Sequence, residues 1–165
     1  MRILDVGCGD EKVKGATGID CVAMPGVDIV HDLNSYPWPL KNNSFDLIYL
    51  NNIIEHLPNP IKFMEEVYRI CKKGGKVKII TVYWNHSDSV TDPQHVSFFN
   101  EYSWDFFTGK RKGYYTNCRF EIESLELTYD EYAKRMFRSK RLLKRLSRFL
   151  CNIIDGMHVT LVKRH

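Results

Sequence analysis

Short apolar runs separated by polar turns dominate the first half of the chain. The run Ile3–Val6 stops at Gly7-Cys8-Gly9, and a second run over 17–20 stops at Asp20. Apolar runs of this length, bounded by glycine or acidic residues, are typical of buried strands. A nearly continuous apolar run over 45–50 predicts a central strand that is buried on both faces. Further strands are predicted over 27–30, 76–82, 120–129 and 157–162. In the strand over 120–129 the alternation of apolar and polar residues slips at Ser124, which indicates a bulge.

Helical spacing follows residue 58. Asn59 is a good N-cap and Pro60 suits the first helical position. Apolar residues then repeat at helical spacing as far as Cys71, and Gly74 behind two lysines predicts the helix end. A strand, a helix and a strand in this order form a βαβ unit, which favours a parallel sheet.

Aromatic residues concentrate in the segment 83–118. Ten of the chain's 21 aromatic residues, Tyr114 among them, fall between positions 83 and 115. This segment is predicted either to close over a pocket or to form an ordinary satellite cluster. Its candidates for pocket lining are Trp84, Phe98, Phe99 and Tyr102, although aromatic clusters more often belong to the core.

Basic residues concentrate in 131–151, which holds eight Lys or Arg against one Glu. We predict one long helix here, with an apolar stripe that packs on the domain: Tyr132, Met136, Leu143, Leu146 and Leu150. The basic side is then a solvated face, the first choice, or it binds an anionic membrane surface. Nucleic acid is the less favoured partner because no stacking aromatics interleave with the charges.

The remaining composition indicates one domain over 1–165, placed in the cytoplasm. Five cysteines lie scattered along the chain and never form a C-x-x-C pair, which favours reduced thiols over a disulfide frame or a zinc ribbon. No apolar stretch is long enough to span a bilayer.

The glycine-rich turn after the first strand indicates a ligand loop. Gly7 and Gly9 lack a Cβ, so the backbone there can adopt unusual dihedral angles and a ligand can approach closely. Asp20 ends the next strand at the carboxyl edge, where open α/β sheets bind ligands. The residues alone therefore predict a nucleotide-like cofactor site.

Six motifs in order resemble the class I S-adenosylmethionine (SAM)-dependent methyltransferases, especially the small methyltransferase type 11 group. They cover about residues 2–82: Leu4 to Gly9, Gly18-Ile19-Asp20, Asp32-Leu33 before Pro37-Trp38-Pro39-Leu40, Asn43 to Ile48, Glu55-His56-Leu57, and Cys71 to Lys76. The resemblance implies an α/β fold of the Rossmann-like type. Its sheet would have seven mostly parallel strands, an antiparallel last strand and helices on both faces.

The resemblance also implies roles for residues around the loop. Asp5, Gly7, Cys8 and Gly9 would surround the methionine part of SAM, largely through backbone groups. Asp20 would accept hydrogen bonds from the ribose hydroxyls.

Three later residues complete the implied cofactor site. Asp32 would accept a hydrogen bond from the adenine amine, Leu33 would pack on the adenine ring, and Asn51 would lie near the methionine end. The alternative for Asp20 or Asp32 taken singly is a turn-capping acid.

The chain departs from the family pattern directly after the loop. Only eight residues, 10–17, separate Gly9 from the rest of the second strand, and Lys12 stands where a third glycine is usual. The first crossover helix is therefore predicted to be very short or missing. One sheet face would then lack its usual cover and expose apolar surface to another element or a second subunit.

Two histidines are candidate catalytic residues. His56 is a general base, a metal ligand or, in the favoured interpretation, a hydrogen-bonded residue at a helix start. The pattern Asn52-x-x-Glu55-His56 is faintly similar to the E-x-x-E-H metal site of the small-RNA 2′-O-methyltransferases. His95 follows a turn and is a candidate base or acceptor-positioning residue, with a loop-stabilising hydrogen bond as the alternative. No metal ion is predicted.

The resemblance implies methyl transfer from SAM to an acceptor that it does not identify, and a small-molecule acceptor is favoured. A homo-oligomer is one of the two ways in which the uncovered sheet face would be buried, the other being a further element of the chain. The alternative is a non-catalytic SAM-binding or interaction module with the same fold. A nicotinamide-dependent dehydrogenase is disfavoured because the third glycine of its loop motif is absent.

Overall fold

The computed structural model describes residues 1–111 and 115–164, so Tyr114 lies outside the described residues. Seven strands are present: β1 (Ile3–Val6), β2 (Thr17–Asp20), β3 (Ile29–Val30), β4 (Phe45–Asn51), β5 (Cys71–Val82), β6 (Phe120–Tyr129) and β7 (Ile154–Lys163). The helices are the short 3₁₀ turn η1 (Ile54–His56), α1 (Pro60–Ile70), α2 (Asp88–Thr91), α3 (Asp105–Thr108), α4 (Glu131–Met136) and α5 (Lys140–Leu146).

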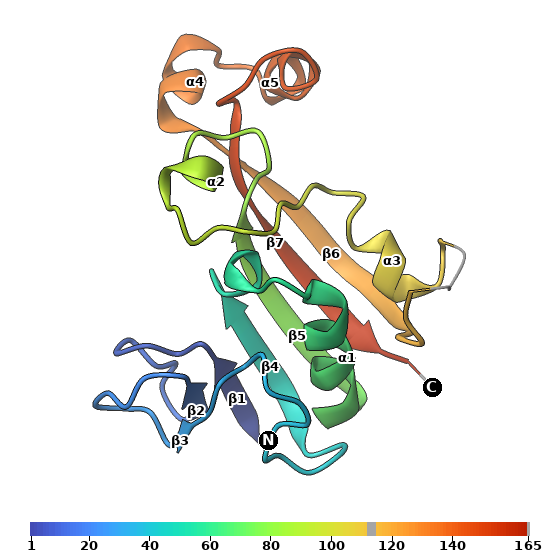
Figure 1. The fold of residues 1–165 in the computed structure, drawn as a ribbon. Coiled ribbons are helices and arrows are strands. Elements are labelled where there is room, and N and C mark those ends of the chain that lie inside the picture. The colour runs from blue at the N-terminus through green and yellow to red at the C-terminus, as the bar shows by residue number, and fades with distance from the viewer. Residues whose placement is uncertain (112–114, 165) are drawn as a thin grey trace.

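The strands form one sheet in the order β3-β2-β1-β4-β5-β7-β6 (Figure 1). Neighbours from β3 to β5 pair in parallel, whereas β7 runs antiparallel to both β5 and β6. This arrangement confirms the predicted Rossmann-like sheet of seven strands with an antiparallel last strand. Because parallel strands point the same way, the carboxyl ends of β1, β2 and β4 lie at one edge of the sheet.

Local signals placed several elements correctly. Strands β1 and β2 have the predicted bounds, and the chain between them contains no helix among the described residues. The pairing of β6 with β7 shifts register between Ile122 and Ser124, where the broken alternation at Ser124 indicated a bulge. The absence of a described helix between β1 and β2 confirms the prediction that the first crossover helix is very short or missing.

Helix α1 begins as predicted and ends earlier. The Asn59 side chain accepts a hydrogen bond from the Lys62 amide at 3.0 Å, and Pro60 opens the helix. Cys71 already has extended dihedral angles and pairs with Phe45 of β4, so β5 starts there and not at residue 76. The prediction that helix continues to residue 73 was wrong because pairing along β4 outweighs the local helical signal. Gly74, at φ 75°, lies where the pairing of β4 with β5 shifts register, between the Phe45–Cys71 and Leu47–Lys76 pairs.

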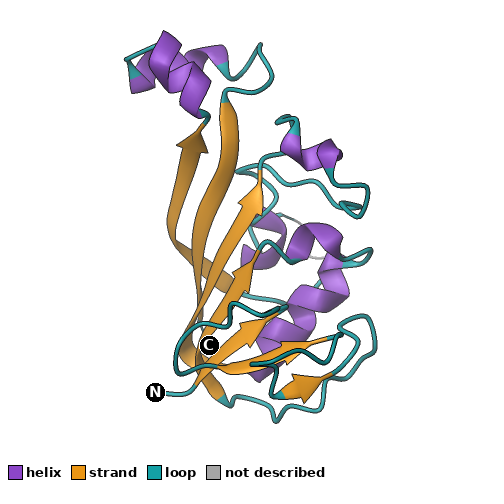
Figure 2. Ribbon diagram, turned by 90° about the vertical axis from the view of Figure 1, so that its left-hand side faces the viewer, coloured by secondary structure: helices purple, strands orange, loops and turns teal. Residues whose placement is uncertain are grey.

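The helices α1, α2 and α3 lie on the same side of the sheet (Figure 2). On that side Phe63, Met64 and Val67 of α1 are fully buried against the strands. The other side differs from the expected helical cover, since neither the β1–β2 nor the β2–β3 crossover contains a helix among the described residues.

The alternation of burial along the central strands shows the same asymmetry. In β5, Val77 and Ile79 are buried while Lys76 and Lys78 are exposed. In β4, Tyr49 is only half-buried. The prediction that β4 is buried on both faces was therefore wrong, because in the part of the chain that the structure describes no helix covers its second face.

The basic segment forms two short helices instead of one. Phe137 ends α4 in an extended conformation, and the Ser139 hydroxyl caps α5 by accepting a hydrogen bond from the Leu142 amide. The expected apolar stripe also fails: Leu143 is buried, but Tyr132 and Met136 are 78% and 72% exposed. Both helices stand at the end of the long β6–β7 pair, beyond the rest of the sheet, where little surface is available to bury such a stripe (Figure 1).

Among the described residues, no helix combines the length and the apolar character that crossing a membrane requires.

Candidate functional site

The loop after β1 has the backbone conformation that its glycines suggested. Gly7 and Gly9 have φ values of 67° and 52°, in the left-handed region that side chains disfavour. The Gly7 amide donates to the Ile19 carbonyl at 2.8 Å, which fixes the loop against β2. Around the position of a Cβ on Gly9 no atom lies within 4 Å, so the backbone there is open to a ligand.

Gly7 lies against the segment that follows β4. A Cβ on Gly7 would stand 2.5 Å from Cγ1 of Ile53, far inside van der Waals contact. The glycine thus permits a close approach of Ile53, and through it the turn η1 with His56 is held beside the loop.

Asp5 braces the short crossover. Asp5 is only 2% exposed, and its carboxylate accepts a hydrogen bond from the Val13 amide at 2.8 Å. Burial raises the pKa of the Asp5 carboxyl above its ordinary value, and the Val13 hydrogen bond opposes that shift. The Asp5 side chain therefore fixes the chain after the glycine loop to the end of β1.

A second set of contacts that stabilises the crossover, made by Asp28, was not predicted from the sequence. The Asp28 carboxylate accepts from the Gly18 amide at 2.7 Å and pairs with the Lys12 ammonium at 2.7 Å. These contacts, the Lys12 one first, lower the pKa of Asp28. Lys12 stands where the family usually has a third glycine and a helix packed on the strand. In this chain its ion pair with Asp28 stabilises the crossover instead.

Asp20 lies next to the loop, as the motif order implied. Its carboxylate accepts hydrogen bonds from the amides of Gly9 at 2.9 Å and Val22 at 3.1 Å. Cys8 is buried beside it, and a Cβ on Gly18 would stand 2.6 Å from the Cys8 sulfur. The structure thus brings Gly7, Cys8, Gly9 and Asp20 together.

Asp32 and Leu33 occupy a turn after β3. The Asp32 carboxylate accepts from the Asn34 amide and the Ser35 hydroxyl, and these hydrogen bonds lower its pKa. Leu33 packs in the core, and its carbonyl accepts a hydrogen bond from the Trp38 indole at 3.1 Å. This pattern matches a turn-capping acid, so the adenine roles of Asp32 and Leu33 stay predictions.

Asn51 ends β4 at the same edge of the sheet. It is half-buried and lines a shallow depression on the open sheet face, together with Tyr49, Lys78 and His158.

The two candidate histidines come together although they are far apart in sequence. The His56 and His95 rings meet edge to face, with centroids 4.7 Å apart. Nε2 of His95 lies 4.0 Å from a carboxylate oxygen of Asp92, and one ligand atom each of His56, Asp92 and His95 fits within a mutual distance of 4.8 Å. Asp92 was not predicted as a site residue, although it opens the turn that aims His95.

Hydrogen bonds between the chain after His95 and the turn η1 hold the two histidines beside each other. The Glu55 carbonyl accepts from the amides of Val96 and Ser97, at 2.9 and 3.0 Å, and the Ser97 hydroxyl donates to the Leu57 carbonyl at 2.7 Å. The Glu55 side chain itself is fully buried, and its carboxylate has no hydrogen-bond partner among the described residues.

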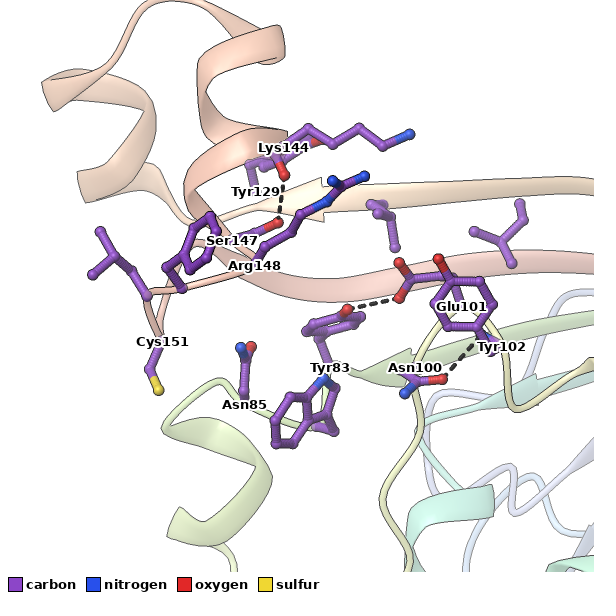
Figure 3. A pocket seen from close by; sticks show the side chains of 15 residues that line it. Tyr83, Asn85, Asn100, Glu101, Tyr102, Tyr129, Lys144, Ser147, Arg148 and Cys151 are labelled. Atoms are coloured by element: carbon purple, nitrogen blue, oxygen red, sulfur yellow. Dashed lines mark hydrogen bonds between the residues drawn. The ribbon is translucent and has the colours of Figure 1, made fainter.

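A larger groove of about 680 Å³ opens beyond β5 (Figure 3). Tyr83, Trp84, Glu101 and Tyr102 line one side, and basic residues of the segment after β6, including Arg148, line the other. The Tyr83 hydroxyl donates to Glu101 at 2.7 Å, and burial together with this carboxylate raises the pKa of Tyr83.

The predicted pocket aromatics therefore separate. Trp84 and Tyr102 line this groove, whereas Phe99 is buried in the core and stacks on Trp104. Phe98 lines another hollow beside α1.

A family model described as a methyltransferase domain matches residues 1–126. The chain belongs to this family. The glycine loop, the strand-end acid and strands β1 to β5 lie in the matched part, and the family's cofactor is SAM.

Among curated relatives, a demethylmenaquinone methyltransferase of Listeria monocytogenes is 24% identical over 110 residues, or 58% of this chain and 44% of the relative. A trans-aconitate 2-methyltransferase of Rhizobium rhizogenes is 27% identical over 115 residues, or 58% of this chain and 42% of the relative. The chain thus spans less than half the length of these relatives.

Solved structures share the fold at low identity. A SAM-dependent methyltransferase of Archaeoglobus fulgidus superposes with a TM-score of 0.66 at 15% identity, covering 98% of this chain and 86% of the other. Phosphoethanolamine N-methyltransferase 2 of Haemonchus contortus, solved with SAM, gives 0.62 at 17% identity over 100% of this chain and 49% of the other.

Proposed function

We propose that this methyltransferase domain transfers a methyl group from SAM to a small-molecule acceptor. The observation that carries the proposal is the left-handed glycine loop, set between the Asp20 carboxylate and the segment after β4. In the proposed site Gly7, Cys8 and Gly9 hold the methionine part, with Asp5 bracing the loop, and Asp20 holds the ribose.

The residues fit this cofactor. Space around Gly9 is open, so its backbone can be approached, and Asp20 offers a carboxylate to hydroxyl donors directly beside it. Asp32 and Leu33 are proposed at the adenine and Asn51 at the methionine end, each at the carboxyl edge of its strand or just beyond it.

Methyl transfer needs little covalent chemistry from the protein. Bound SAM supplies a methyl group already activated on a sulfonium. The chain's own residues bind and orient the two reactants, and such positioning accounts for much of the rate. Where the acceptor must lose a proton, we assign that role to His95, with His56 beside it.

The hydrogen bonding of His95 favours the tautomer that this role requires. Its Nδ1 lies 3.3 Å from the Ser89 carbonyl, which can only accept a hydrogen bond. Nδ1 therefore carries the proton in the neutral ring, and Nε2 keeps a lone pair.

A small-molecule acceptor is supported by the relatives, whose names specify demethylmenaquinone and trans-aconitate as methylated compounds. The groove beside Tyr83 is large enough for such a compound, since ligand pockets commonly measure about 300–1,000 Å³. Cytoplasmic location and self-association stay predictions.

Incubation with methyl-labelled SAM and fractionated cell extract tests the proposal. We expect label in the small-molecule fraction, and a His95→Gln variant should lower the rate by about 10²–10⁴ if His95 takes a proton in the reaction. The matched control is His158→Gln, an exposed histidine on the sheet face. SAM binding without any labelled product would favour the non-catalytic module, and label confined to macromolecules would contradict the acceptor class.

The basic segment 131–151 is proposed to contact an anionic membrane surface. Exposed apolar side chains, among them Tyr132, Met136 and Phe149, stand among its eight cations. This combination is typical of interfacial segments, in which apolar groups enter the headgroup region and cations attract anionic lipids.

A further inference from the structure

The side chains of His56, Asp92 and His95 form a cluster that the cofactor site does not use. They come from η1 and from the loop between α2 and α3, and each is partly buried. Two imidazoles and one carboxylate form a ligand set that suits first-row transition metals such as Zn²⁺, whereas Mg²⁺ and Ca²⁺ prefer sets of oxygen ligands. We propose that these three residues bind a divalent transition-metal ion of the zinc type.

The spacing of the ligand atoms supports the proposal. The three ligand atoms lie within 4.8 Å of one another, and the His95–Asp92 pair is 4.0 Å apart. Ligands of a tetrahedral zinc ion stand about 3.4 Å apart, given bonds of roughly 2.0–2.1 Å. Small side-chain rotations therefore close the site around the ion.

The hydrogen bond of His95 to Ser89 provides a second, independent observation. Metal-binding histidines usually donate their other ring N–H to a carbonyl or a carboxylate, which fixes the tautomer and the ring orientation. Here Nδ1 faces the Ser89 carbonyl at 3.3 Å, so Nε2, the atom nearest Asp92, keeps the lone pair that a metal requires. The hydrogen bonds of Val96 and Ser97 to η1 then hold the two histidines at a fixed separation.

Three protein ligands leave one tetrahedral position for a water molecule or an oxygen of a ligand. Because Ile53 packs on Gly7, the turn that carries His56 lies beside the proposed SAM loop. Resting on the proposed function, we assign this open position to a hydroxyl or carboxylate oxygen of the methyl acceptor. In the metal-bound state, His56 and His95 act through the ion and not as free bases.

Metal binding is tested directly on the tag-free, chelator-treated chain by titration with Zn²⁺ and with Co²⁺. We expect one ion per chain, and for Co²⁺ the strong visible absorption of four-coordinate sites. His95→Gln, His56→Gln and Asp92→Asn should each weaken binding by about tenfold or more, whereas His158→Gln should leave it unchanged.

Each variant is also assayed for its thermal shift with SAM, which reports the fold and the cofactor site separately from the metal. Loss of metal binding with a retained SAM shift supports the proposed cluster. Absence of binding by the parent chain, or equal binding by the His56→Gln/His95→Gln variant, would overturn the metal site and leave the proposed methyl transfer untouched. A SAM shift missing in the parent would contradict the methyltransferase proposal alone.

Discussion

Gly7 and Gly9 differ in what surrounds them, although both have a left-handed backbone. The position of a Cβ on Gly7 is filled by Ile53, while the corresponding space at Gly9 is empty. The sequence indicated glycines with unusual dihedral angles, but it gave no sign that a residue 46 positions away packs on one of them. Contacts of this kind depend on the tertiary fold and leave no local pattern.

This difference predicts unequal effects of one substitution. Asparagine tolerates a positive φ, so Gly9→Asn should cost less than about 1 kcal/mol of unfolding free energy. Gly7→Asn adds a collision with Ile53 and should cost about 1–3 kcal/mol more. Denaturant unfolding measures both, and Ile53→Ala should recover part of the loss in the Gly7 variant. Equal losses for the two variants would contradict the described packing.

The cysteines provide a pH-dependent test of burial. Cys71 and Cys118 are buried, and burial raises the pKa of each thiol to about 11. The thiolate is the reactive form, so at pH 8 these two should alkylate very slowly, and the reaction should accelerate as the pH rises toward their pKa. Cys21 and Cys151 are exposed and should react first. Mass spectrometry identifies the labelled sites, and early labelling of Cys118 would contradict the fold.

Elements with a strong local signal were predictable from the sequence. Strands β1 and β2, the Asn59 cap and the bulge near Ser124 all appear where the pattern placed them. The end of α1 was not predictable, because pairing of Cys71 with β4 decides it. The break at Ser139 was missed because the basic residues on both sides favour helix, whereas a capping serine can start a new one.

We expect the basic segment 131–151, which contains α4 and α5, to bind anionic vesicles. Each cation near an anionic surface contributes about 1 kcal/mol, so the double variant Arg138→Glu/Arg141→Glu should weaken binding by at least about tenfold. Vesicle flotation with anionic and with zwitterionic lipid measures the effect. Both arginines are exposed, and the control Lys62→Glu/Lys73→Glu makes the same charge change on exposed residues outside the segment.

Two outcomes would contradict this proposal. One is equal flotation of the parent chain with both lipids, and the other is an equal loss of binding in the control variant.

The whole molecule differs from a sheet covered on both faces. Its open face was expected to be apolar, but along β5, β7 and the edge strand β6 it presents Lys76, Lys78, His158 and Glu123, with a Lys76–Glu123 ion pair at 2.7 Å. Polar alternation along β5 and β6 therefore makes the face compatible with water. The short crossover in the sequence predicted the missing helix. The lysines that alternate with apolar residues along β5 were the sequence signal that the uncovered face is polar.

The proposed function of the whole molecule depends on SAM binding at the glycine loop. A ligand that binds only the folded state raises the melting temperature, and a 100-fold excess over the dissociation constant adds about 2.7 kcal/mol. The most direct measurement is the thermal shift of the parent chain with SAM, S-adenosylhomocysteine and NAD, repeated for Asp20→Ala and for the exposed loop control Asp10→Ala. We expect a shift with both SAM species and none with NAD, and this shift should be reduced by Asp20→Ala and kept by Asp10→Ala. No shift with either SAM species, or one that Asp20→Ala leaves unchanged, would contradict SAM binding at the glycine loop.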